Sequence, residues 1–193
     1  MHPNEPARSE HVISDTGPSE ADQDEYKRLS VNAAKGVGVV TAVHRGWDNA
    51  VTVTDFLSVS YDPPTILVSL YSLSRMAEAL DEVQHWGLSL LASDQRGVAD
   101  ALGYEGNPLV GLLDHVPHFR RAGGAPPLIA GSLSWFELRT VAKHEVATHT
   151  LFVGEVTAMG RAAVATARPL IRFQSGYLGA TTDLRASDER RPT

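Results

Sequence analysis

The segment AVTVTDFLSVSYDPPTILVSLYSLSRM, residues 50–76, contains two apolar runs separated by a pair of prolines. In the first run, apolar residues alternate with threonine and serine, and the alternation changes phase near Asp55. This pattern predicts a β-strand with a bulge or bend at that point. The sequence Asp62-Pro63-Pro64 should end the strand, because proline lacks a backbone N–H and fixes its own φ angle.

The second apolar run, residues 65–70, predicts a partner strand that leads into a helix. Ser72 or Ser74 can cap this helix with its hydroxyl group. The first strand then presents a row of hydroxyls, and the helix start presents backbone N–H groups without partners. Such groups could hold a flat polar ring and a phosphate.

The rest of the chain predicts short strands with a few helices between them. Strands are expected at 36–44, 86–92, 128–141 with a kink at Gly131-Ser132, 148–159 and 169–173, and helices at 24–35, 74–83 and 93–102. Residues 45–49 should form a turn, and residues 103–127 a long loop rich in glycine and proline. Closely spaced strands without regular βαβ alternation favour an antiparallel barrel over a parallel sheet.

Composition limits the class of protein. A chain of 193 residues that is 42% hydrophobic suits one domain, which we place at 24–180, with disordered tails at 1–23 and 181–193. Without cysteine there is no disulfide, thiolate metal site or cysteine nucleophile, in keeping with a reducing cytoplasm. No apolar run reaches the roughly 18–20 residues that span a bilayer, and the N-terminal residues lack the basic and apolar regions of a signal peptide.

The formal net charge of −6 disfavours nucleic acid as a partner, because nucleic-acid binding requires a basic surface.

Five motifs occur in the order found in one known family. Residues 36–41 are similar to G-V-x-V-V-T, and 52–64 to T-A-N-S-F-x-S-V-S-x-x-P-P. Residues 74–76 are similar to S-R-x, 149–156 to H-x-L-F-x-G-E-V, and 169–177 to P-L followed by G-x-Y. Together they resemble the flavin reductase family with the FMN-binding split barrel, over roughly residues 26–179.

The resemblance implies a mainly β fold, an antiparallel split β-barrel with peripheral helices. It also implies a homodimer in which the partner subunit helps to wall the flavin site. The implied activity is an NAD(P)H:flavin oxidoreductase that supplies reduced flavin to a partner monooxygenase by moving hydride from nicotinamide C4 to flavin N5. The cofactors would be FAD or FMN, with NADH or NADPH as co-substrate, and no side chain is expected to act as an essential acid or base.

The resemblance also implies the site residues. Flavin would be bound by Thr52, Val53, Thr54, Asp55, Phe56, Ser58, Val59, Leu73, Ser74 and Arg75. The nicotinamide would lie by His149 and Tyr177. The residues alone also allow plainer interpretations: a half-buried strand at 52–59, a solvated Arg75, a strand histidine paired with a carboxylate, and a tyrosine at the rim.

Several positions depart from the family pattern. Asp55 replaces a small neutral residue, and a carboxylate there would disfavour reduction of the ring unless it points away or accepts a ring N–H. Thr54 stands for a common asparagine and Met76 for a frequent threonine. Ala147-Thr148 replace the Gly-Asp before the histidine, and Gly176 is shifted by one position.

Other chemistries find less support in the sequence. The close histidine pairs, His115 with His118 and His144 with His149, lack an H-E-x-x-H pattern, so no metal site is expected. Neither a nucleotide-binding glycine fingerprint nor G-x-S-x-G occurs. Two alternatives remain open: a flavin-retaining oxidase similar to the pyridoxamine-phosphate oxidases, and a non-enzymatic flavin- or haem-binding sensor.

Overall fold

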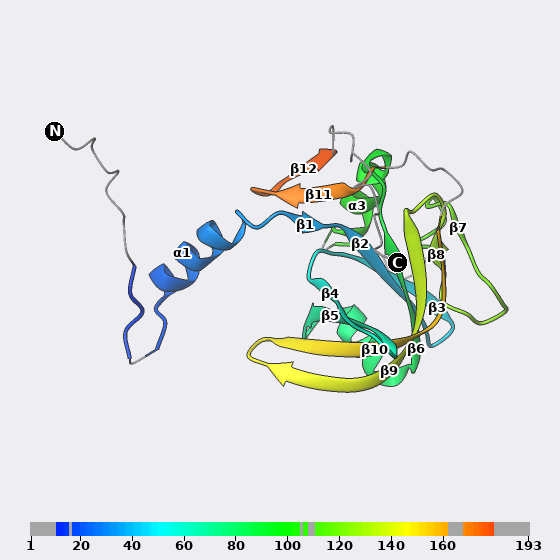
Figure 1. The fold of residues 1–193 in the computed structure, drawn as a ribbon, viewed down its shortest axis with the longest axis horizontal. Coiled ribbons are helices and arrows are strands. Elements are labelled where there is room, and N and C mark those ends of the chain that lie inside the picture. The colour runs from blue at the N-terminus through cyan, green and yellow to red at the C-terminus, as the bar shows by residue number, and fades with distance from the viewer. Residues whose placement is uncertain (1–10, 16, 105, 108–110, 162–167, 180–193) are drawn as a thin grey trace, which may run out of the picture.

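The structure is a computed structural model that describes residues 11–15, 17–104, 106–107, 111–161 and 168–179. The described chain is mainly β (Figure 1). Its helices are α1 (Glu20–Ser30), α2 (Arg75–Glu82), α3 (Arg96–Leu102) and the short 3₁₀ helix η1 (Ser93–Gln95). Its strands are β1 (Lys35–Gly36), β2 (Gly38–His44), β3 (Trp47–Val53), β4 (Phe56–Tyr61), β5 (Pro64–Tyr71), β6 (His85–Leu90), β7 (His118–Phe119), β8 (Leu128–Ile129), β9 (Ser134–Val146), β10 (His149–Arg161), β11 (Leu170–Phe173) and β12 (Gly176–Gly179).

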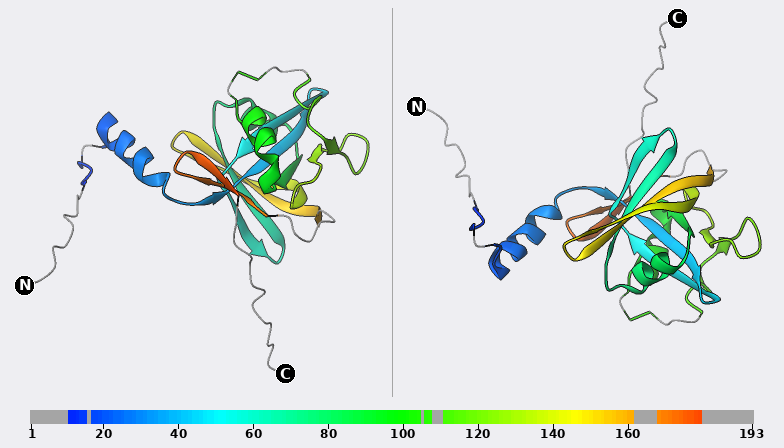
Figure 2. Two further views of the ribbon diagram at one scale, coloured as in Figure 1. Left: turned by 90° about the horizontal axis from the view of Figure 1, so that it is seen from above. Right: turned by 90° about the horizontal axis from the view of Figure 1, so that it is seen from below.

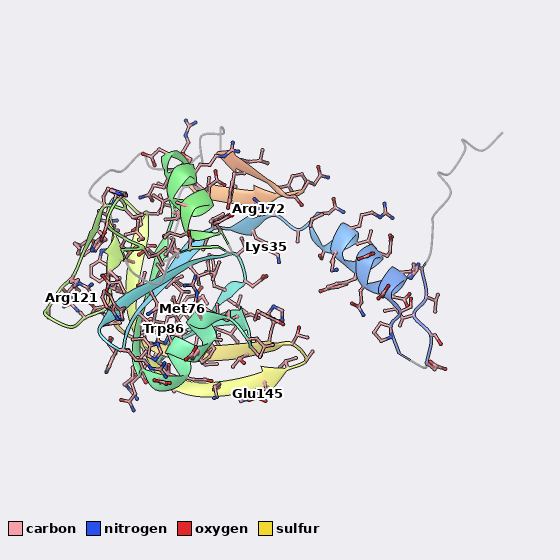
Figure 3. All side chains as sticks on the ribbon, turned by 180° about the vertical axis from the view of Figure 1, so that it is seen from behind. Lys35, Met76, Trp86, Arg121, Glu145 and Arg172 are labelled. Carbon is pink, nitrogen blue, oxygen red and sulfur yellow. The ribbon has the colours of Figure 1, made fainter. Side chains whose placement is uncertain are left out.

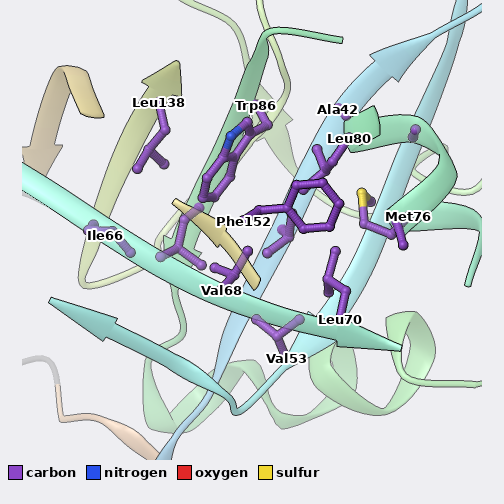
Figure 4. Close-up of a cluster of buried hydrophobic side chains, with 14 residues drawn as sticks. Ala42, Val53, Ile66, Val68, Leu70, Met76, Leu80, Trp86, Leu138 and Phe152 are labelled. Atoms are coloured by element: carbon purple, nitrogen blue, oxygen red, sulfur yellow. The ribbon is translucent and has the colours of Figure 1, made fainter. Parts of the chain in front are cut away.

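The main sheet has seven antiparallel strands in the order β3-β2-β6-β9-β10-β5-β4. It curls around one core, because side chains from β2, β3, β5, β6, β9 and β10 share a single buried cluster that α2 covers (Figure 4). Two smaller sheets, β1-β11-β12 and β7-β8, complete the body. This curled antiparallel sheet confirms the predicted mainly β class.

The phase change near Asp55 coincides with a bend at Thr54, which divides the single strand that the sequence predicted into two. The chain leaves β3 at Val53 and enters β4 at Phe56, and these strands form opposite ends of the sheet order. The register shift lies further on, between Ser58 and Ser60, where β4 pairs with β5. The alternation breaks at Asp55 because the polypeptide crosses from one edge strand to the other.

Other boundaries also differ from those predicted. Arg45 and Gly46 both have positive φ angles and form a tight hairpin turn, so β3 already begins at Trp47. The long strand expected at 128–141 is divided into β8 and β9, with Gly131 in the left-handed region between them. The predicted loop 103–127 contains the short strand β7, and β12 was not predicted at all.

Helix α1 projects from the body (Figure 2), and none of its residues is buried. It begins at Glu20, so it crosses the predicted boundary between tail and domain at residue 23. Ser19 caps it, accepting from the Asp22 backbone N–H, while the Asp22 carboxylate accepts from the Ser19 N–H. The tail predictions for residues 1–10 and 181–193 lie outside the described residues. None of the described helices has the length and apolar character to cross a membrane.

Trp86 and Gly154 pack closely against each other in the main core. Trp86 is fully buried, and its Nε1 donates to Thr140 Oγ1 at 3.1 Å. A Cβ atom on Gly154 would lie 2.6 Å from the Trp86 ring and 3.0 Å from the Cβ of Leu138. The glycine therefore lets β10 approach the indole closely.

Substituting Gly154 with alanine should lower the free energy of unfolding by about 1–3 kcal/mol, because the added methyl group overpacks the core. Chemical denaturation followed by far-UV circular dichroism measures this. Gly97→Ala is the matched control, since a Cβ there meets no atom within 4 Å. That control should be neutral or slightly stabilising, because alanine favours helix. An unchanged midpoint in Gly154→Ala would contradict the packing argument.

Candidate functional site

A pocket of about 500 Å³ opens where β3, the end of β5, the start of α2 and the end of α3 meet. Its walls combine backbone of β3 with polar and aromatic side chains. The lining includes Val51, Tyr71, Leu73, Ser74, Arg75, Gly103, Tyr104 and Asn107. The structure thus brings three of the predicted flavin residues, Leu73, Ser74 and Arg75, into one pocket.

The start of α2 brings hydrogen-bond donors and one arginine to this pocket. Ser74 is the N-cap, and its hydroxyl accepts from the Ala77 N–H at 3.2 Å. Its own N–H donates to Tyr71 O at 2.9 Å, which fixes the turn between β5 and α2. The first N–H groups of a helix lack partners within the helix and favour anions. Arg75 adds a full positive charge beside them and donates to Asn107 O at 2.8 Å.

The predicted residues on β3 and early β4 serve mostly as scaffold. Thr52 Oγ1 donates to Ala99 O at 2.9 Å and ties β3 to α3. Val53 is buried in the main core, and Phe56 packs against that core. Ser58 and Phe56 line a separate, largely apolar pocket of about 430 Å³, while Val59 is 52% exposed.

Thr54 and Asp55 lie beside basic residues that the sequence interpretation did not include. Lys35 Nζ donates to Asp55 Oδ1 at 2.6 Å. Thr54, Lys35 and Arg172 line a hollow of about 170 Å³. Figure 3 shows Lys35 and Arg172 near each other, close to where α1 joins the body. In the sequence, no motif marks Lys35 as a site residue; it only directly precedes the strand predicted from Gly36.

His149 lies next to the pocket through Tyr71. The two residues are cross-strand partners, and their rings meet edge to face with centroids 6.0 Å apart. Thr148 Oγ1 is within hydrogen-bond distance of His149 Nδ1, at 3.0 Å. Tyr71 and Asn107 were missed by sequence reasoning, because an aromatic strand end and a loop amide carry no motif.

The structure does not place Tyr177 on the same sheet as His149. Tyr177 belongs to β12, where the guanidinium of Arg172 lies 4.7 Å from its ring centroid and that of Arg96 5.9 Å. Its ring also packs against the second buried cluster of the protein. The two predicted nicotinamide residues therefore occupy separate sheets of this chain.

The donor set of the pocket fits the phosphate end of a flavin. A helix N-terminus, a serine N-cap and an arginine all favour an anion at one end. Tyr71 and Leu73 provide apolar surface next to it, and both are largely exposed. An amphipathic ligand with an anionic end would suit this arrangement.

Comparisons with known proteins agree with the fold. The flavin reductase like domain matches residues 31–181. The NADH-dependent flavin reductase StyB of Pseudomonas fluorescens is 34% identical over 149 residues, which cover 76% of this chain and 83% of StyB. The FMN reductase (NADH) SmoA of Agrobacterium fabrum is 34% identical over 144 residues, covering 75% of this chain and 78% of SmoA.

A solved structure supports the same assignment. BorF, the flavin reductase component of a bacterial two-component tryptophan halogenase, superimposes with a TM-score of 0.75 at 31% identity, covering 82% of this chain and 98% of BorF. The residues that the flavin reductase like domain matches, 31–181, include the curled sheet and the pocket at the start of α2. The chain belongs to the flavin reductase like family.

Proposed function

We propose that this protein is an NADH:flavin oxidoreductase that supplies reduced flavin to a partner monooxygenase. The observation that carries the proposal is the pocket at the start of α2, where Ser74 and Arg75 offer an anion site beside the Tyr71–His149 ring pair. When bound, the flavin supplies the hydride-accepting ring. FAD and FMN both present the phosphate that this pocket suits, and the names of the relatives favour NADH.

In this proposal the residues of the chain bind the flavin and orient the nicotinamide beside it. Arg75 and the first N–H groups of α2 hold the phosphate, with Ser74 fixing the helix start. Strand β3 borders the pocket at Val51 and would support the ring from one side, and Leu73 would cover it. His149 and Tyr177 orient the nicotinamide. Hydride transfer between two bound rings depends chiefly on their alignment, so no side-chain acid or base is required.

A homodimer would complete the site and would explain two exposed apolar features. The outer face of β4 and β5 presents Leu57, which is 62% exposed and paired across the strands with Leu67. Tyr61, on the same hairpin, is 91% exposed. Helix α1 presents Tyr26 and Leu29 away from the body. Exposed apolar surface of this kind is typical of protein–protein contacts. We place the enzyme in the cytoplasm, with the monooxygenase that uses its product.

Replacing His149 with alanine should raise the KM for NADH by about three- to tenfold, because one aromatic contact to the nicotinamide is lost. The kcat should change little, since the histidine transfers no proton. Steady-state kinetics with saturating flavin separates the two parameters. His85→Ala, an exposed histidine at the start of β6, is the control. Complete loss of turnover in His149→Ala with flavin and NADH still bound would contradict the assigned role.

The proposed function itself is tested on the unmodified protein. Purified protein is titrated with FAD and with FMN, and NADH oxidation is then followed with each flavin. Saturable flavin binding together with flavin-dependent oxidation supports the proposal. Absence of saturable binding of either flavin would overturn it.

A further inference from the structure

A second pocket, which we call the hairpin pocket, adjoins the pocket at the start of α2. It has a volume of about 460 Å³ and lies between the turn that joins β2 to β3 and the loop before β8. Asp48 and Leu112 line both pockets. Along β3, Trp47 lines the hairpin pocket, and Val51, about 13 Å further along the strand, lines the other. One extended ligand can therefore occupy both.

The loop wall of the hairpin pocket is held in place by packing and by hydrogen bonds. Leu113 and Val116 are buried in the second core cluster. Arg120 ties the loop to β3, because its Nη2 donates to Asp48 Oδ2 at 2.6 Å while its Nη1 donates to Ala125 O. The pocket is therefore formed without a ligand, as small-molecule sites usually are.

The polar groups that line the hairpin pocket are mostly hydrogen-bond acceptors. Asp48 and Asp114 contribute carboxylates, whose oxygens can each accept more than one bond. His118 Nδ1 lies 2.8 Å from Val116 O, and since a carbonyl only accepts, Nε2 of the neutral ring is an acceptor. Arg120 brings a positive charge, but Asp48 already pairs with it. This set suits a neutral group with hydroxyl or amino donors, and it disfavours an anion.

Trp47 adds a flat aromatic surface to this pocket. Its side chain is 54% exposed and belongs to neither of the buried clusters. Nucleobases stack on aromatic side chains of this kind. A nucleoside matches the whole lining, because its base can stack on the indole while its ribose hydroxyls donate to the carboxylates.

We propose that the hairpin pocket is a subsite for the adenosine end of a dinucleotide whose phosphate lies at Arg75. The inference rests on the proposed function and goes beyond it, because it makes the protein select a dinucleotide over a mononucleotide. FAD and NADH both carry this adenosine end. FAD is the expected source, since the phosphate site at the start of α2 is the one assigned to the flavin.

The first test measures dissociation constants for FAD and FMN in matched variants. Wild-type protein should bind FAD at least about tenfold more tightly than FMN. Trp47→Ala should weaken FAD binding by about 5- to 50-fold, the loss expected for one stacked base, and leave FMN binding unchanged. Trp47→Phe retains a ring and should keep most of the preference. Val141→Ala removes a similarly exposed apolar side chain from β9 and should change neither affinity.

The second test identifies NADH as the source if FAD is not. It compares the KM for NADH with the KM for reduced nicotinamide mononucleotide, which lacks the adenosine. An increase in the KM for NADH alone in Trp47→Ala, with FAD binding unchanged, would assign the subsite to NADH. Either pattern supports an adenosine subsite in the hairpin pocket.

The remaining outcomes would overturn the inference. One is a Trp47→Ala variant in which neither FAD binding nor the KM for NADH changes. Another is a loss of FMN affinity as large as that of FAD, because the tryptophan would then act on the fold. In both cases the proposed function survives if the wild-type protein binds flavin and oxidises NADH, whereas wild-type protein that binds no flavin would overturn both. Melting temperatures of the ligand-free variants report directly on the fold.

Discussion

Alanine in place of Arg75 is expected to weaken flavin binding by about 10- to 100-fold, as the loss of one hydrogen bond between charged groups predicts. Arg75 is the cation beside the start of α2, and its side chain lines the pocket with Ser74 and Asn107. Its removal leaves only helix N–H groups for the phosphate. Titration of FMN by quenching of flavin fluorescence measures the change.

A control variant and a control ligand test whether the effect is specific to the phosphate. Arg121→Ala removes an exposed arginine that pairs with Glu137 away from the pocket, and it should leave flavin affinity unchanged. Riboflavin, which lacks the phosphate, should bind wild-type and Arg75→Ala protein equally. A loss of riboflavin affinity as large as that of FMN would show that Arg75 acts on the fold instead of on the phosphate.

The second large effect concerns stability. Substitution of Trp86 by alanine should lower the free energy of unfolding by about 3–5 kcal/mol, because a fully buried indole leaves a cavity. The substitution also leaves Thr140 Oγ1 without the Nε1 donor. Domains of this size are stabilised by about 5–15 kcal/mol, so much of the margin would be lost.

Urea denaturation of Trp86→Ala against Trp47→Ala provides the measurement. Trp47 is 54% exposed at the start of β3, so its removal should cost much less. Equal losses in the two variants would contradict the placement of Trp86 at the centre of the core.

The sequence predicted best where local chemistry and tertiary structure agree. The alternation in residues 65–70, the Ser74 cap and the apolar face of α2 are local signals, and the structure forms β5 and α2 there. Local sequence also marked the irregularity near Asp55 and the kink at Gly131-Ser132. It did not show that the chain crosses at Asp55 from one end of the sheet order to the other, because that depends on which strands become neighbours.

For the site, too, residues in local motifs could be predicted and contacts between distant residues could not. Leu73, Ser74 and Arg75 were implied by the family resemblance, and the predicted helix start supported Ser74 and Arg75; all three line one pocket. The ion pair between Lys35 and Asp55 could not be predicted, because its two residues lie twenty positions apart in the sequence. Thr52 and Val53 were chosen by motif, but their side chains are used for packing and for a bond to α3.

Oxidation of NADH by the purified protein, with and without added FAD or FMN, tests the central claim most directly. The account predicts slow oxidation without flavin and a large, saturable acceleration when flavin is added, with NADH preferred to NADPH. Flavin that binds without any oxidation of NADH or NADPH would contradict it, and would favour an oxidase or a sensor built on the same sheet.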